Sequence, residues 1–270
     1  MQKLHLLGIC LLAVVAFPIN SCRKVDEMKF LLENGRADLR QCSIQHMSQL
    51  LLFSAEPTVT LTFTYNNRKD PVSVIPDLGP FQWLLSYDKN GRLSQFMVLR
   101  GDGHFEIWHV YLYDNKGRII GDSAYREGLP SDRNTALARW LSNEYYDHLE
   151  RVIKETQISP GINISVEYTY NNQGNLISRR ISDNGQISIE NIGSYVNEAS
   201  VLLTNHIWRY LARDYSLNSR SYAYSLNEHG LAIEYRGTDG HDIGTFFFGS
   251  YEDTQLVIQY DCQDAPDIAK

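Results

Sequence analysis

The sequence predicts a mainly all-β protein, an antiparallel meander of repeated hairpins that forms a large curved sheet or open barrel with one to three short helices. Three observations predict this fold: aromatic residues alternate and end in tyrosine, an Asp/Asn- and Gly-containing turn follows, and an apolar run then begins again. The clearest copies lie at residues 83–93, 110–119 and 168–176, and looser copies at 63–72, 145–153 and 222–233. Since each copy is a hairpin in miniature, their recurrence indicates a meander.

The turn residues explain why each hairpin reverses. In the run from Tyr87 to Arg92, the carboxylate of Asp88 can accept a backbone N–H two residues on, and Gly91 suits the left-handed position of a type I turn with a bulge. Side chains alternate along a strand, so the tyrosines before the turns share one face of the sheet. The tyrosines of this candidate aromatic face are Tyr87, Tyr111, Tyr113, Tyr168, Tyr170, Tyr222 and Tyr224.

Two interpretations of the aromatic face stay open. Cross-strand aromatic pairs contribute roughly 0.2 to 1 kcal/mol each, so the tyrosines could form a buried core that holds the register of the sheet. Alternatively, an exposed tyrosine platform could stack on the apolar faces of sugar rings, because tyrosine tolerates a wet edge. The first interpretation predicts buried rings and the second predicts exposed ones.

Three segments interrupt the strand pattern and predict helices. Residues 197–211 have apolar side chains near helical spacing, with Asn197 as the expected N-cap, and we expect this helix to cover an open edge or end of the sheet. Residues 131–141 form an Ala- and Arg-rich insertion between two repeats. Residues 24–32 are a shorter candidate.

Residues 1–21 are predicted to be a signal peptide that does not belong to the fold. Lys3 supplies the positive charge, and the run from Leu4 to Phe17 is almost wholly apolar. This run is too short for a membrane span, which needs about 20 residues, but it fits the core of a signal peptide. Residues 22–41 would then connect the membrane to the fold.

The segment after the apolar run resembles a bacterial lipoprotein box. Ile19 lies three residues before Cys22, and the small Ser21 directly precedes it. The resemblance implies cleavage before a diacylated Cys22, which becomes the new amino terminus, and three acyl chains such as palmitate that anchor the mature protein to the bacterial outer membrane. The periplasmic and the outward-facing sides both stay open. An ordinary secretory signal, with Cys22 as an incidental thiol, is the alternative.

Composition limits the partners. The formal net charge is −7, which argues against binding to the phosphate backbone of nucleic acid.

Residues 42–270 are expected to form a single domain, because no Pro-, Ser- or Gly-rich linker divides them. Cys42 and Cys262 lie near the two ends of this domain, and they are expected either to form a disulfide, in an oxidising envelope, or to stay as two buried thiols.

Most of the domain resembles a family of Gram-negative envelope lipoproteins whose hairpins are similar to the YD repeats of RHS-type proteins. The residues that carry this resemblance are Cys42, Tyr65–Asn67, Pro71–Val74, Ser86–Asp88, Arg92–Leu93, Phe105–Tyr111, Arg118–Ile120 and Asp122–Tyr125. The resemblance implies a tyrosine-rich β meander on an envelope lipoprotein. It supplies no reaction, substrate or catalytic residue.

The remaining chemical motifs are weak. Gly121-Asp122-Ser123 is similar to a serine esterase block but lacks the strand-to-helix context that a nucleophile needs. The segments 100–104 and 236–241 each place Asp, Gly and His after an apolar strand, which is more typical of a hairpin turn than of a metal site. We therefore expect no catalytic residue, no metal and no cofactor.

The sequence thus favours a lipid-anchored, non-enzymatic module that binds an envelope protein or a glycan. A hydrolase that acts on extracellular polysaccharide and a purely structural envelope spacer are the alternatives. A groove with exposed Tyr and Trp would favour glycan binding. An exposed apolar patch would favour a protein partner, and close carboxylates in a cleft would favour hydrolysis.

Overall fold

A computed structural model of the chain describes residues 39–51, 57–220, 223–236, 247 and 254–262. The predicted signal peptide, Cys22, nearly all of the tether, the candidate helix at residues 24–32 and Tyr222 lie outside these described residues. Within them, no helix has both the length and the apolar character that crossing a membrane requires.

The described residues form one sheet of fifteen antiparallel strands, as the sequence predicts. The strands are β1 (Cys42–Leu51), β2 (Pro57–Tyr65), β3 (Pro71–Pro76), β4 (Phe81–Tyr87), β5 (Leu93–Arg100), β6 (Phe105–Tyr113), β7 (Ile119–Gly128), β8 (Ala138–Tyr146), β9 (Val152–Ser159), β10 (Ile162–Tyr170), β11 (Leu176–Asp183), β12 (Gln186–Asn191), β13 (Ala223–Leu226), β14 (Ala232–Arg236) and β15 (Thr254–Cys262). From β12 to β1 each strand pairs with its neighbour in sequence, and β15, β14 and β13 extend the sheet beyond β1. The two outermost strands, β12 and β13, do not pair, so the sheet is open.

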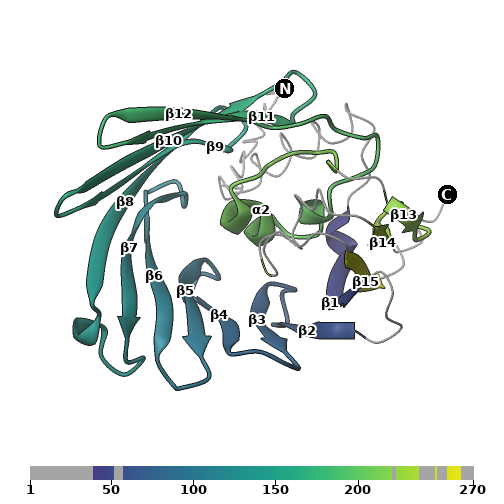
Figure 1. Ribbon diagram of the computed structural model, residues 1–270, viewed down its shortest axis with the longest axis horizontal. Helices are drawn as coiled ribbons and strands as arrows, with labels where there is room; N and C mark the ends of the chain where they lie inside the picture. The colour runs from purple at the N-terminus through teal and green to yellow at the C-terminus, as the bar shows by residue number, and fades with distance from the viewer. Residues whose placement is uncertain (1–38, 52–56, 221–222, 237–246, 248–253, 263–270) are drawn as a thin grey trace, which may run out of the picture.

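The sheet curls around a short helix, α2 (His206–Ala212), which lies inside the curl (Figure 1). The 3-10 segment η3 (Val201–Thr204) precedes α2 and packs against β1. Trp208 of α2 is buried in one cluster with Phe63 and Val74, and Ile207 in a second cluster with Leu85. The core therefore fills the concave face of a single curved layer.

The turns have the predicted geometry. Gly91 N–H donates to Asp88 O at 2.9 Å, and Gly117 N–H donates to Asp114 O at 3.1 Å. The two glycines have φ values of 79° and 77°, the left-handed region that glycine adopts without strain. The register of each pair shifts by a residue next to the turn, at Tyr87 and at Tyr113. Both segments are thus type I turns with a bulge.

The two faces of the sheet differ as the alternation predicts. Phe63, Tyr111 and Tyr168 are buried on the concave face. Their neighbours in sequence, such as Thr64 and Leu112, are exposed on the convex face. The aromatic side chains therefore supply much of the core, and the convex face is mixed.

A recurring interaction, which we call the Asp–Arg–Tyr rung, links each of three turns to the following hairpin. In each rung an arginine pairs with the aspartate four residues earlier and stacks over a tyrosine of the next repeat. The Cζ-to-ring distances are 4.3, 5.6 and 4.2 Å. The rungs are Asp88–Arg92–Tyr113, Asp114–Arg118–Tyr146 and Asp147–Arg151–Tyr170. Cation–π contacts at such distances contribute about 0.5–1 kcal/mol at exposed sites.

The helix expected at residues 197–211 forms only in the second half of this range, as α2, and the 3-10 segment η3 precedes it. Asn205 is extended, with φ −154°, and its side chain accepts from Ile207 N–H, so Asn205 and not Asn197 caps α2. Ser200 caps the preceding 3-10 segment. The prediction that this helix covers an open edge or end is wrong, because its apolar side chains fill the concave face.

The helix expected at residues 131–141 is also wrong. Only η2 (Arg133–Thr135) is helical, and β8 begins at Ala138. Asp132 caps η2 by accepting from Asn134 N–H at 2.9 Å. Hydrogen bonding to β7 and β9 on both sides of β8 outweighs the helix propensity of Ala and Arg, since propensity is a weak prior beside tertiary pairing.

Cys42 and Cys262 form a disulfide that joins β1 to β15, close to the β13 edge of the sheet, one of the two alternatives that the sequence left open. It lies in a third apolar cluster with Leu217 and Leu231. The bond closes a loop with a sequence separation of 220 residues. A constraint on so long a loop removes much of the conformational freedom of the unfolded chain.

We expect the Cys42→Ser/Cys262→Ser double variant to lower the free energy of unfolding by about 2–5 kcal/mol. Urea unfolding with and without reductant measures this change. The double variant is the control, because reductant should leave its midpoint unchanged. Two alkylated thiols in the unreduced native protein would contradict the bond.

Candidate functional site

The predicted tyrosine platform does not form an exposed surface in the described residues. Tyr111 and Tyr168 are buried, with 8% and 7% of their area exposed. Tyr87, Tyr113 and Tyr170 are half-buried on the same concave face, whereas Tyr224 is 62% exposed on the terminal strand β13. The core interpretation therefore describes this face better than the platform interpretation.

The half-buried tyrosines are also engaged by their neighbours. The hydroxyl of Tyr87 donates to Pro71 O at 2.7 Å, and that of Tyr113 donates to Leu93 O at 2.6 Å. Burial raises the pKa of Tyr111 and of Tyr168 well above the ordinary value, so both phenols stay neutral. Arg92 covers the face of Tyr113 and the Tyr113 hydroxyl is bonded to Leu93, so this ring links two neighbouring hairpins.

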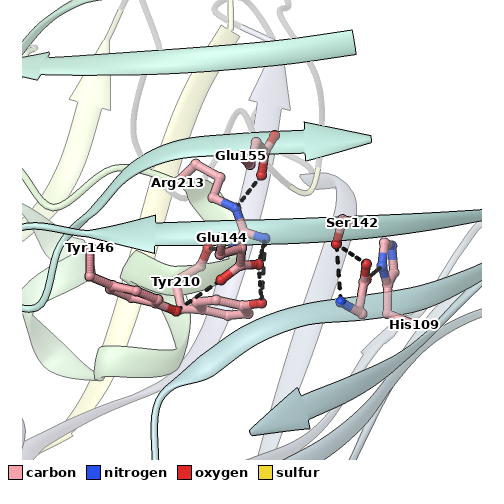
Figure 2. A network of polar contacts seen from close by, with 8 residues as sticks. His109, Ser142, Glu144, Tyr146, Glu155, Tyr210 and Arg213 are labelled. Atoms are coloured by element: carbon pink, nitrogen blue, oxygen red, sulfur yellow. Dashed lines mark hydrogen bonds and ion pairs between the residues drawn. The ribbon is translucent and has the colours of Figure 1, made fainter. Parts of the chain in front are cut away.

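A polar network connects α2 to the concave face (Figure 2). Arg213 follows α2 in a left-handed conformation, with φ 52°. Its Nη2 lies 2.6 Å from Oε1 of Glu144 on β8, and its Nε lies 2.8 Å from Oε2 of Glu155 on β9. Tyr210 and Tyr146 donate their hydroxyls to Glu144 at 2.7 and 2.8 Å. One arginine thus binds two neighbouring strands to the helix.

This network bears on the hydrolase alternative, because Glu144 and Glu155 are directly opposite each other on adjacent strands. Both carboxylates are bound to Arg213, and the side chain of Glu144 is fully buried. Burial raises the pKa of Glu144, although the Arg213 charge and the tyrosine hydroxyls oppose this shift. The pair is a bridged structural ion cluster, and it does not have the open cleft that a carboxylate pair needs around a glycosidic bond.

Beside this network, Asp122 on β7 accepts from two side chains (Figure 2). His109 Nδ1 contacts Oδ2 of Asp122, and the Ser142 hydroxyl contacts Oδ1. Burial raises the pKa of Asp122, but the interactions with His109 outweigh it and keep the pKa below the ordinary value. Ser142 bonds the aspartate and not the histidine, so the three residues do not form a nucleophile–base pair.

The sequence does not predict this cluster. Asp122 belongs to a Gly-Asp-Ser block in the sequence, but its side chain points to the interior and Ser123 lies on the opposite face by strand alternation. Asp122 on β7 is directly opposite Tyr111 on β6, and His109 lies two residues before Tyr111 on the same face, a relation that only the pairing of β6 and β7 reveals.

The Asp-Gly-His segment at residues 100–104 is a hairpin turn, the interpretation that the sequence favoured. Gly103 N–H donates to Arg100 O at 3.0 Å, and Asp102 pairs with Arg100 at 2.7 Å. Most of the segment at 236–241 lies outside the described residues. Elsewhere, ligand atoms of Cys42, Cys262 and His229 lie within 4.8 Å of one another, but the joined sulfurs offer no thiolate to a metal.

The convex face carries a hollow of about 430 Å³, which we call the convex groove. Its lining includes Gln95, Trp108, Tyr125, Asp132, Arg133 and Asn134. The Trp108 indole donates to Gln95 Oε1 at 2.9 Å, and its ring lies 6.5 Å from that of Tyr125. The groove therefore combines two oriented aromatic rings with planar polar side chains.

The loop between β7 and β8 completes the convex groove. Arg133 in this loop lies 5.3 Å from the Trp108 ring and 5.5 Å from the Tyr125 ring. Asp132 holds Asn134 through its N–H and its side chain, both at 2.9 Å. The sequence does not predict this site, because the Ala- and Arg-rich composition of residues 131–141 indicates a helix and not a loop. The signal that could have found it is the alternation that puts Trp108 on the face opposite Tyr111.

The fold and these contacts define an all-β protein in which one open antiparallel sheet curls around a short helix. No protein-family model matches the chain, and no curated protein matches it either. Among solved structures, it is similar to a porin-like protein from Bacteroides uniformis ATCC 8492, with a TM-score of 0.47 and 12% identity over 80% of this chain and 96% of that one. It is also similar to TcdB2-TccC3 without its hypervariable C-terminal region, with a TM-score of 0.22 and 16% identity over 71% of this chain and 14% of that one.

We expect Arg213→Met to lower the free energy of unfolding by about 3–5 kcal/mol, because it leaves the buried Glu144 charge without its partner. Burial already raises the pKa of Glu144, so the loss should shrink as the pH falls and Glu144 becomes protonated. Urea unfolding at neutral and at acidic pH measures both effects.

Two further variants control this prediction. Arg180→Met breaks the exposed pair with Glu167 and should cost under about 1 kcal/mol. Arg213→Met/Glu144→Gln should recover part of the lost stability, since the unpaired buried charge is gone. Equal losses in Arg213→Met and Arg180→Met would refute the buried ion cluster as a major source of stability.

Proposed function

We propose that the protein is a lipid-anchored outer-membrane protein that binds a glycan, without catalysing a reaction, through the convex groove. The proposal rests on one observation. Two aromatic rings, Trp108 and Tyr125, line a hollow of about 430 Å³ together with the polar side chains of Gln95, Asp132 and Asn134. This volume falls within the range of small-molecule sites, roughly 300–1,000 Å³.

The chemistry of the convex groove suits a sugar. The apolar face of a pyranose packs on an aromatic ring, and its hydroxyls bond to planar side chains that both donate and accept. Asn134 and Gln95 can do both, Asp132 accepts and Arg133 donates. Because Arg133 covers both rings in the free protein, sugar binding would replace the guanidinium or stack beside it.

The anchor part of the proposal rests on the sequence. The apolar run from Leu4 to Phe17 and the lipoprotein-like box before Cys22 support export and acylation. Acylation contributes about 0.8 kcal/mol per buried CH₂, enough for stable attachment when several chains are present. The curled sheet would then be held near the membrane surface, with the glycan as its partner.

We expect Trp108→Ala to lower the affinity for a glycan at least tenfold, because it removes the larger of the two rings in the convex groove. A glycan array with the full-length protein identifies the ligand, and calorimetry then measures its affinity. Asn134→Ala, in the exposed loop, should weaken binding severalfold with little effect on folding.

The matched control is Tyr145→Ala, which removes an aromatic ring that is 50% exposed on the convex face but outside the groove. It should bind like the unmodified protein. Unchanged binding by both groove variants would exclude the groove as the glycan site, and an array without any bound glycan would favour the structural spacer.

We expect Cys22→Ala to release the protein from the membrane fraction, since the acylated sulfur is the proposed attachment. Fractionation of cells, with immunoblotting of membrane and soluble fractions, tests this. Cys10→Ala, which alters the other cysteine of the amino-terminal region, should leave attachment intact. Retention of Cys22→Ala in the membrane would contradict the anchor.

A further inference from the structure

A second hollow, which we call the rim cavity, lies on the other side of the sheet. It has a volume of about 400 Å³ and lies where the turns of the β4–β5, β6–β7 and β8–β9 hairpins meet α2. Its lining includes Arg92, Tyr113, Arg118, Tyr146, His148 and Glu150. The cavity shares no lining residue with the convex groove.

Two guanidinium groups are fixed in its wall by the Asp–Arg–Tyr rungs. Arg92 binds Asp88 through Nε and Nη2, at 2.8 and 2.7 Å, and stacks on Tyr113. Arg118 binds Asp114 through Nε at 2.8 Å and stacks on Tyr146. Within the described part of the chain, Nη1 of each arginine has no hydrogen-bond partner. Each guanidinium group is thus held in place by its aspartate and keeps the N–H donors of Nη1 for a ligand.

The third turn departs from the repeat at this cavity. The first two turns read Asp-Lys-Asn-Gly and Asp-Asn-Lys-Gly, whereas the third reads Asp-His-Leu-Glu at 147–150. Glu150 has φ 62°, in the region where Gly91 and Gly117 lie without strain. His148 is exposed and adds a ring that can donate or accept. The third turn thus has a glutamate where the first two have glycine, and all three of His148, Leu149 and Glu150 line the cavity.

The lining favours an organic ligand that carries an oxyanion. It contains three arginines and one carboxylate, Glu150, and the two paired aspartates are not part of it. A guanidinium fork matches the two oxygens of a carboxylate or phosphate. Leu93, Ile119 and Ile207 supply apolar contacts that an inorganic ion would not use.

The geometry points to the rim cavity as a binding site for a small organic anion, such as a sugar that bears a carboxylate or a phosphate. Arg92 and Arg118 would bind the oxyanion through their uncommitted Nη1 groups, and the apolar lining would cover the carbon skeleton. The inference is independent of glycan binding in the convex groove, which faces away from the cavity.

Calorimetry of the full-length protein with glucuronate, glucose 6-phosphate, inorganic phosphate and glucose tests the inference. We expect glucuronate or glucose 6-phosphate to bind at least tenfold more tightly than glucose and than inorganic phosphate. Tighter binding of glucuronate would indicate a carboxylate ligand, and tighter binding of glucose 6-phosphate would indicate a phosphate ligand. Equal affinities for all four, or no binding of either organic anion at millimolar concentration, would overturn the inference.

The third rung supplies a matched control. Arg92→Gln/Arg118→Gln should lower the affinity for the preferred anion at least tenfold. Arg151→Gln breaks the same aspartate pair and the same tyrosine stacking, but Arg151 does not line the cavity, so this variant should bind within twofold of the unmodified protein. An equal loss in Arg151→Gln would mean that the rungs act through folding and would overturn the inference.

Arg118→Lys separates charge from geometry. It keeps the positive charge but loses the planar fork, so we expect an affinity between those of the unmodified protein and the double variant. The melting temperature of every variant, measured in parallel, tells loss of the site from loss of the fold. Glycan binding that persists in Arg92→Gln/Arg118→Gln would show that the two sites are separate.

Discussion

The structure depends on the Asp–Arg–Tyr rung, because it couples the turn of one hairpin to the next hairpin in the sheet. In the first rung, Asp88 closes its turn by accepting from Asn90 and Arg92 N–H, both at 2.9 Å. The same carboxylate binds the Arg92 side chain, which stacks over Tyr113 of the following hairpin. A local turn interaction thus becomes an interaction between repeats. The three rungs favour the observed register of the strands between β4 and β11, since a slip of one residue would move the tyrosine to the opposite face.

A single curled sheet cannot bury its concave face by itself, and this requirement explains the segment that contains α2. A two-layer domain covers each apolar face with a second element, whereas here the sheet curls around a short helix (Figure 1) whose Trp208 is buried in one of the core clusters. The helix is only seven residues long, so its own hydrogen bonds contribute little stability. The packing of Trp208 and Ile207 and the ion cluster of Arg213 hold it in place. The interior therefore combines aliphatic and aromatic packing with one buried ion cluster.

The sequence predicts the features that arise from neighbours along the chain. Asp88 and Gly91 identify a turn, and strand alternation puts Tyr111 inside and Leu112 outside, because both effects act within a few residues. The position of α2 could not be predicted, since it depends on how far the whole sheet curls. The groove and the ion cluster also depend on strand register: Glu144 faces Glu155, and Trp108 lies beside Tyr125, only after β6 to β9 have paired. The helix expected at residues 131–141 fails for the same reason.

The two hollows both occur where the chain departs from its repeat, and this relation has a physical basis. A regular hairpin repeat uses its turn residues for the backbone and its inward residues for the core, so it leaves few side chains for a ligand. The loop between β7 and β8 is longer than the other hairpin turns from β1 to β12 and carries Asp132, Arg133 and Asn134 over Trp108. The turn at 147–150 has Glu150 in the left-handed conformation that Gly91 and Gly117 adopt in the two preceding turns of the Asp–Arg–Tyr rungs. Such a conformation costs of the order of 1 kcal/mol, which the rest of the sheet must offset. The repeat thus supplies a stable frame, and its irregular positions supply the side chains that can recognise a ligand.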